Sequence, residues 1–241
     1  MGLLAVGCAS AEPGPEAACG GAGAEVALAT ADGEVLTADW WPAPAQGAPA
    51  VVLVHMIPPT WDRSSWPGRA RRALADEGWA VLTIDRRGAG GSTGDPEAAY
   101  EGDGGRRDLD AAVRFLVDAT CGVDSERLAL VGASNGTTSV NDYAASHDAT
   151  LPDAAANVFL SPGAYTENQN LVAANLGLGG ALLWMYPTDE PWSEGFRDAA
   201  PDGWRFVQRG LEHGTQMLDG GELEDATLAD LTAFLADVFG R

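Results

Sequence analysis

Residues 128–136 read Leu128-Ala129-Leu130-Val131-Gly132-Ala133-Ser134-Asn135-Gly136. Four apolar residues, typical of a buried strand, lead directly into a Gly-x-Ser-x-Gly pentapeptide. A chain that leaves a strand and enters a helix within so few residues must turn sharply, and only small side chains leave room for that turn. Gly132 and Gly136 provide this room. We therefore expect Ser134 to project from a tight turn at the carboxyl end of a strand.

Apolar runs of strand length recur through the chain, and segments with helical patterning separate most of them. The predicted strands cover residues 26–30, 35–41, 50–54, 80–84, 128–131, 155–160, 181–186 and 204–207. The predicted helices cover residues 66–77, 106–118, 136–147, 168–176 and 223–239. Because the strands from residue 50 onward are continuously apolar, they indicate a mostly parallel sheet with helices on both faces. The first two strands flank Ala31-Asp32-Gly33-Glu34 and are predicted to form a hairpin.

Length and composition favour one large domain. The chain has 241 residues, of which 46% are hydrophobic, and this is enough for a single large core. We assign residues 1–23 to a signal-like start with a flexible linker, and residues 24–241 to the domain. The formal net charge of −21 repels phosphate backbones, so we expect no nucleic-acid partner. All 14 basic residues are arginine, which excludes a catalytic lysine.

The first residues read Met1-Gly2-Leu3-Leu4-Ala5-Val6-Gly7-Cys8 and resemble the end of a bacterial lipoprotein signal peptide. Small residues precede Cys8, and a stretch rich in alanine, glycine and proline follows it. We expect an exported protein, periplasmic or at the cell surface, whose membrane association would be limited to a lipid anchor at Cys8. The alternative is an accidental match in a cytoplasmic protein. Cys19 and Cys121 then remain as a disulfide pair or as two unrelated thiols.

Ser134 can act as a nucleophile only with a base and a carboxylate nearby, because a serine hydroxyl reacts poorly near neutral pH. The chain has three histidines. His147 ends the helix after Ser134, and His55 ends a strand; we predict structural roles for both. His213 lies on a glycine-flanked loop just after the strand at 204–207. We predict that His213 is the base.

The carboxylate that orients this base should follow another strand, upstream of the histidine. The strand at 181–186 runs into Pro187-Thr188-Asp189-Glu190. Asp189 is the first acidic residue after that strand, and we predict that it accepts the imidazole N–H of His213. Glu190 is the alternative.

With Ser134, Asp189 and His213 in this order, residues 25–240 resemble the α/β-hydrolase family. Two further stretches match patterns of that family, Asp85-Arg86-Arg87-Gly88-Ala89-Gly90-Gly91-Ser92 and Ser161-Pro162-Gly163. The resemblance is closest to small dienelactone-hydrolase-like and esterase members. The stretch between the strands at 155–160 and 181–186 is too short for a large cap domain. It implies an eight-stranded, mostly parallel sheet whose first hairpin is antiparallel. Dienelactone hydrolases have a cysteine nucleophile, so their lactone substrate is not carried over.

Acyl transfer also needs N–H groups directed at the developing oxyanion. The backbone N–H of Asn135, directly after the nucleophile, is predicted to be one donor. The second should come from the loop His55-Met56-Ile57-Pro58-Pro59, where many members of the resembled family have His-Gly. We predict the Met56 N–H as this donor, with Ile57 as the alternative, since neither proline has an N–H.

These residues predict a serine hydrolase that cleaves a small carboxylic ester or thioester through an acyl-enzyme intermediate. The expected partner is a small-molecule ester. No cofactor is required, and no pair of histidines has metal-ligand spacing. Two alternatives remain open, a catalytically silent scaffold that acts as an exported binding protein, and a small exopeptidase.

Overall fold

The computed structural model describes residues 23–119, 122–163, 179–200 and 202–240. Three features of the sequence analysis lie outside these residues: the signal-like start with Cys8, the pairing of Cys19 with Cys121, and the helix at 168–176. None of the helices within the described residues is both long and apolar enough to cross a membrane.

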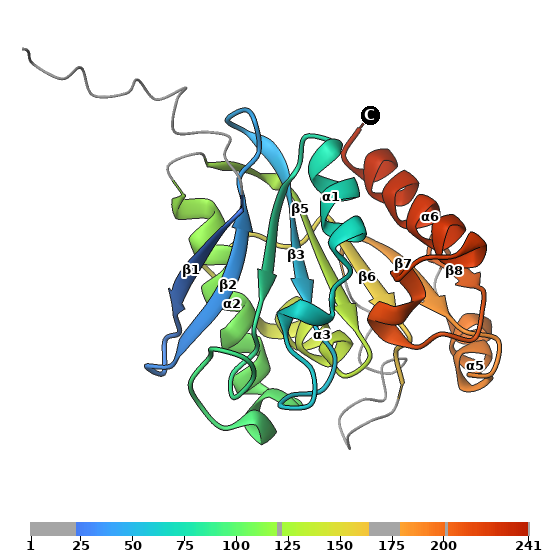
Figure 1. Cartoon of the computed structure of the whole chain (residues 1–241), viewed down its shortest axis with the longest axis horizontal. Coiled ribbons are helices and arrows are strands. Elements are labelled where there is room, and N and C mark those ends of the chain that lie inside the picture. Colours follow the sequence, from blue (N-terminus) through green and yellow to red (C-terminus); the bar gives the residue numbers. More distant parts are fainter. Residues whose placement is uncertain (1–22, 120–121, 164–178, 201, 241) are drawn as a thin grey trace, which may run out of the picture.

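Within the described residues, one eight-stranded sheet runs through the molecule (Figure 1). Its strands are β1 (Ala24–Ala29), β2 (Val35–Trp41), β3 (Ala48–Val54), β4 (Ala80–Ile84), β5 (Val123–Ala133), β6 (Ala156–Leu160), β7 (Ala181–Tyr186) and β8 (Arg205–Gln208). Their spatial order is β1-β2-β4-β3-β5-β6-β7-β8. Strand β2 is antiparallel to both of its neighbours, and the other pairs are parallel. This confirms the predicted sheet and its antiparallel first hairpin.

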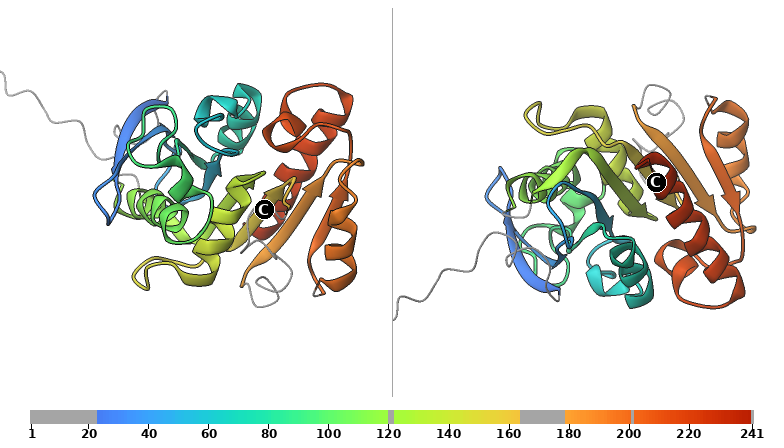
Figure 2. Two further views of the ribbon diagram at one scale, coloured as in Figure 1. Left: turned by 90° about the horizontal axis from the view of Figure 1, so that it is seen from below. Right: turned by 90° about the horizontal axis from the view of Figure 1, so that it is seen from above.

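Helices cover both faces of the sheet, as the continuously apolar strands predict (Figure 2). The α-helices are α1 (Gly68–Asp76), α2 (Asp103–Asp118), α3 (Gly136–Ser146), α5 (Trp192–Ala199) and α6 (Glu222–Val238), and the short 3-10 helices are η2 (Arg63–Ser65), η3 (Pro96–Ala99) and η4 (Gly214–Leu218). Leu74 of α1 and Leu231 of α6 belong to the core on one face. Leu109 of α2 and Val140 of α3 belong to the core on the other. The sheet is therefore buried on both sides.

Among the described strands and α-helices, two elements differ from the sequence-based expectation by more than three residues. Helix α5 was not predicted, because it is short and contains Gly195, a poor helix former. Strand β5 begins at Val123 rather than Leu128, because Val123 pairs with Ala48 of β3 although the residues that follow it are polar. Neither difference changes the order of the strands.

The parallel strands end at one edge of the sheet, which lies at the bottom of Figure 1. Ser134 directly follows β5, at the centre of that edge, and β3 and β6 lie on either side of β5. Loops after β3, β7 and β8 carry His55, Glu190 and His213 to the same edge. Ligand sites in open α/β sheets form outside the carboxyl ends of the strands, so a functional site is expected at this edge.

Candidate active site

Ser134 lies in a turn with unusual backbone geometry. Its φ of +49° falls in the left-handed region that residues with a side chain rarely adopt. Its N–H donates to the Leu160 carbonyl at 2.8 Å, and its carbonyl accepts the Thr137 N–H at 3.0 Å. A Cβ at Gly132 would lie 2.7 Å from the Gly136 carbonyl oxygen, which confirms that small residues are needed here. The turn fixes the serine at the end of β5, where it keeps 7% of its surface exposed.

His213 lies against this hydroxyl. Its Nε2 is 2.8 Å from Ser134 Oγ, within the range of an O–H···N hydrogen bond. The side chain of His213 is 38% exposed, so the imidazole is in contact with solvent. The structure thus brings together the serine and the histidine that were predicted to act as nucleophile and base.

The carboxylate partner of His213 is Glu190, and the prediction that Asp189 contacts this histidine is wrong. His213 Nδ1 donates to Glu190 Oε1, and Glu190 is 5% exposed whereas Asp189 is exposed. The Glu190 N–H donates to the Pro187 carbonyl at 3.2 Å, which closes a turn with Thr188 and Asp189 at its two corners. The corner residues of such a turn face solvent, and the longer glutamate reaches back to the imidazole.

The loops that carry Glu190 and His213 are anchored to neighbouring segments. The N–H and the Oγ1 of Thr188 both donate to the Gly210 carbonyl at 2.9 Å, which joins the loop after β7 to the loop after β8. The Gly214 N–H donates to Ser161 Oγ at 2.9 Å. Ser161 is fully buried with a φ of +50°. Its only signal in the sequence was the Ser-Pro-Gly match, which gave no hint that it holds the loop of the base.

The other two histidines lie away from the hydroxyl, as predicted. His147 stacks on Tyr143, and its Nδ1 lies 3.0 Å from the Tyr143 carbonyl. His55 is buried, with its Nδ1 2.7 Å from the Met56 carbonyl and its Nε2 accepting the Arg86 N–H at 2.9 Å. These contacts place the proton of the neutral ring on Nδ1. His55 therefore shapes the loop after β3, the structural role expected from the sequence.

The environment of His55 keeps its imidazole neutral. Burial, with a smaller contribution from the Arg86 cation, lowers the pKa of His55 to about 3. An exposed histidine titrates near 6.5, so below that pH the unfolded chain binds a proton that the folded chain excludes. The stability that His55 contributes is therefore complete above about pH 6.5 and is lost as the pH falls toward 3.

This linkage predicts the pH dependence of a variant. The free energy of unfolding of the wild type, relative to His55→Gln, should fall by about 2 kcal/mol between pH 6.5 and pH 5. Unfolding by denaturant at several pH values in this range measures the difference in free energy of unfolding between the two proteins. The carboxylates are the same in both proteins, so the effect of their protonation cancels in this difference. Parallel stability curves for the two proteins would contradict a neutral His55.

The N-terminus of α3 packs tightly against the end of β3. A Cβ at Gly136 would lie 2.4 Å from the His55 carbonyl oxygen. Among the described residues, no acceptor takes the backbone N–H of Asn135, Met56 or Ile57. These three N–H groups, from the end of β5 and the loop after β3, thus lie at the edge where Ser134 emerges and can donate a hydrogen bond to a bound molecule.

The side chain of Met56 extends from this loop toward the base. A Cβ at Gly214 would lie 2.5 Å from Met56 Sδ and 3.6 Å from Ser134 Cβ. The loop after β3 and the loop of His213 therefore meet beside the nucleophile. Among the residues that the structure describes, no cluster of three or more histidine, cysteine or acidic side chains is arranged to hold a metal ion.

Solved structures with the same fold include several hydrolases. An esterase from Pyrococcus furiosus matches with a TM-score of 0.71 and 17% identity, covering 90% of this chain and 92% of that one. A hydrolase from Thermoplasma acidophilum matches with a TM-score of 0.67 and 15% identity, covering 90% and 99%. A dipeptidyl peptidase 4 from Porphyromonas gingivalis matches with a TM-score of 0.64 and 16% identity, covering 89% of this chain and 35% of its own. At these identities the matches show a shared fold.

A family match gives the closer assignment. The sequence model described as "Serine aminopeptidase, S33" matches residues 49–191, more than half of the chain. These residues include the loop after β3, the turn at Ser134 and Glu190. The finer resemblance to dienelactone hydrolases stays a prediction. The chain belongs to this serine aminopeptidase family of α/β hydrolases.

Proposed function

We propose that this hydrolase cleaves a small carboxylic ester, or a thioester, through an acyl-enzyme formed on Ser134. The observation that carries the proposal is the unbroken hydrogen-bond path from Ser134 Oγ through His213 to Glu190. Each group in this path has the chemistry that its position requires, namely a hydroxyl, an imidazole and a buried carboxylate. The same path argues against a silent binding scaffold.

The proposed reaction has two steps that use the same groups. His213 Nε2 takes the hydroxyl proton as Ser134 Oγ attacks the carbonyl carbon, and the tetrahedral intermediate collapses when the protonated imidazole gives this proton to the leaving alcohol. Water then attacks the acyl-enzyme with the same histidine as base, which releases the acid and regenerates the serine. Glu190 stabilises the imidazolium that forms in each step, because its carboxylate is buried beside Nδ1.

In this proposal the oxyanion is held by two backbone N–H groups. Asn135 contributes one, at the N-terminus of α3, where the helix dipole also favours negative charge. The second comes from the loop after β3, from Met56 or from its neighbour Ile57. Support comes from the close packing of Gly136 on His55, which brings this loop to the start of α3.

Labelling with a fluorophosphonate probe tests the nucleophile. We expect one probe per chain, attached to Ser134 with loss of fluoride, and no labelling of Ser134→Ala. Intact-mass measurement detects both outcomes. A wild-type protein that stays unlabelled and hydrolyses no ester would instead support the binding-protein alternative.

An aminopeptidase activity is the second candidate, because the matched family is described as serine aminopeptidase. The same Ser134, His213 and Glu190 would serve it, so only substrates can separate the two. A rate survey of p-nitrophenyl esters of increasing chain length against aminoacyl p-nitroanilides makes the comparison. Higher kcat/KM on the anilides would favour the aminopeptidase, and higher kcat/KM on the short esters favours the esterase.

A further inference from the structure

Arg86 is a fully buried cation behind the catalytic edge. It lies in the loop directly after β4 and has no exposed surface. Its guanidinium donates to the Met56 carbonyl at 3.3 Å, to Asn135 Oδ1 at 2.8 Å, to Ser139 Oγ at 3.0 Å and to the Ala99 carbonyl. All of these acceptors are neutral. A buried charge without a contacting carboxylate is costly, which calls for a reason why an arginine occupies this position.

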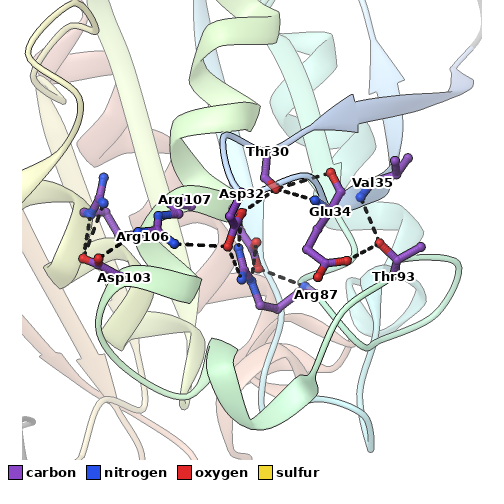
Figure 3. Close-up of polar contacts among 10 residues, drawn as sticks. Thr30, Asp32, Glu34, Val35, Arg87, Thr93, Asp103, Arg106 and Arg107 are labelled. Carbon is purple, nitrogen blue, oxygen red and sulfur yellow. Dashed lines mark hydrogen bonds and ion pairs between the residues drawn. The ribbon is translucent and has the colours of Figure 1, made fainter.

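The neighbouring Arg87, in the same loop, is paired with carboxylates, as is usual for a buried arginine. Its N–H and Nε donate to Asp108 at 2.9 Å and 2.8 Å, and its guanidinium is paired with Asp32 at 2.9 Å. Figure 3 shows Arg87 directed toward Asp32, in a group of charged side chains near the β1–β2 turn and the start of α2. Arg87 contacts neither Met56 nor Asn135 among the described residues. It is therefore a natural control for Arg86.

Two of the contacts of Arg86 fall on the two sides of the proposed oxyanion hole. Asn135 is held at its side chain, since its Oδ1 accepts from Arg86 and its Nδ2 donates to the Tyr100 carbonyl at 3.0 Å. Met56 is held at its carbonyl, which belongs to the same planar trans peptide as the Ile57 N–H. Fixing that carbonyl toward Arg86 therefore fixes the Ile57 N–H in the opposite direction.

A closed ring of hydrogen bonds strengthens this arrangement. The Arg86 N–H donates to His55 Nε2, the His55 Nδ1–H donates to the Met56 carbonyl, and the Arg86 guanidinium donates to the same carbonyl. The Met56–Ile57 peptide is thus held by two donors from the protein interior. Burial lowers the pKa of Arg86 to about 10, which leaves the guanidinium protonated near neutral pH.

We propose that Arg86 is a positioning residue that sets both sides of the oxyanion hole. It holds the Asn135 side chain and the Met56–Ile57 peptide from behind, so that the second donor is the Ile57 N–H rather than the Met56 N–H. The inference rests on the proposed serine-hydrolase function. Donors that are fixed before the reaction stabilise the transition state without reorganising, and this effect appears in kcat more than in substrate binding. The positive charge, held in a low-dielectric interior, also favours the developing oxyanion.

Paired substitutions test this role. Arg86→Met should lower kcat on a short p-nitrophenyl ester by about 10- to 100-fold with KM within about threefold. The inhibition constant of an aryl trifluoromethyl ketone, which forms an oxyanion on Ser134, should rise by a similar factor. Arg87→Met should lower the melting temperature but keep both kinetic constants within about threefold, because Arg87 contacts no part of the oxyanion hole.

Each outcome decides the inference. An Arg86→Met protein that melts cooperatively and keeps both kcat and the affinity for the ketone overturns it, and so does an equal loss of kcat in Arg87→Met. If Arg86→Met does not fold, Asn135→Ala decides alone, with an expected loss of about tenfold in kcat and in ketone affinity. Ser134→Ala in the same assay separates the two proposals. If Ser134→Ala retains activity, both the serine-hydrolase proposal and the role of Arg86 are overturned. If Ser134→Ala loses activity while Arg86→Met keeps it, only the role of Arg86 is overturned.

Discussion

His213→Ala is expected to lower kcat on an ester substrate by about 10⁵- to 10⁶-fold, because the residues of such a triad act as a unit and the hydroxyl is a weak nucleophile without its base. The structure supports the role of this histidine as the base, since His213 Nε2 lies 2.8 Å from Ser134 Oγ. Steady-state and single-turnover rates measure the loss. Circular dichroism of the variant should be unchanged, because the side chain of His213 is partly exposed at the edge of the sheet.

His147→Ala is the matched control for the loss of an imidazole. This histidine packs on Tyr143 at the end of α3 and makes no contact with Ser134 among the described residues. Its removal should leave kcat within about twofold of the wild type, since it removes no part of the triad. A His213→Ala protein that retains near-wild-type turnover would remove His213 as the base.

Glu190→Gln is expected to lower kcat by about 10³- to 10⁴-fold, the range seen when the acid of such a triad is replaced by its amide. The amide cannot stabilise the imidazolium, and its NH₂ group can favour the wrong tautomer of His213. The expected loss applies to kcat, with KM little changed, because Glu190 is buried behind the histidine.

Asp189→Asn provides the control one residue away. Asp189 is exposed at the corner of the turn after β7, so its substitution should keep kcat within about threefold of the wild type. Measuring both variants on the same ester assigns the acid directly. A large loss in Asp189→Asn with a mild effect in Glu190→Gln would restore the assignment that the sequence alone suggested.

Most of the sheet was predictable because its strands carry their own signal. The bounds of β4 and β7 coincide with the predicted 80–84 and 181–186, since both strands are almost wholly buried and so read as uninterrupted apolar runs. The start of β5 carried no such signal. Residues 124–126 of β5 are polar and largely exposed, and they extend the strand only because Val123 pairs with Ala48 across the sheet.

Ser134 and His213 could be predicted, because local sequence pattern and the order of residues along the chain were enough to identify them. Ser134 lies in a pentapeptide whose glycines are required by backbone contacts, and His213 was the histidine left after two structural assignments. The choice between Asp189 and Glu190 depended on the turn that begins at Pro187, which directs the first acid outward. Asp189 is of a residue type that is common in turns, and this was the signal that could have corrected the choice.

Arg86 could not have been assigned from sequence. It stands at a variable position of the Asp-x-Arg-Gly-x-Gly-x-Ser pattern, and nothing in that pattern distinguishes an inward arginine from an outward one. Its partners come from segments that are distant in the chain, Met56, Ala99, Asn135 and Ser139. Contacts of this kind exist only once the loops meet at the edge of the sheet.

The left-handed backbone at Ser134 means that the nucleophile is kept at a cost in folding stability. Glycine would adopt a φ of +49° without strain, whereas a residue with a side chain there forfeits about 1–3 kcal/mol of folding free energy. Selection for heat resistance alone would therefore replace this serine by glycine and erase the hydroxyl. A protein that keeps Ser134 must therefore gain the lost stability from the packing of its core. Mutations that weaken this core should be tolerated less well in the wild type than in a Ser134→Gly protein.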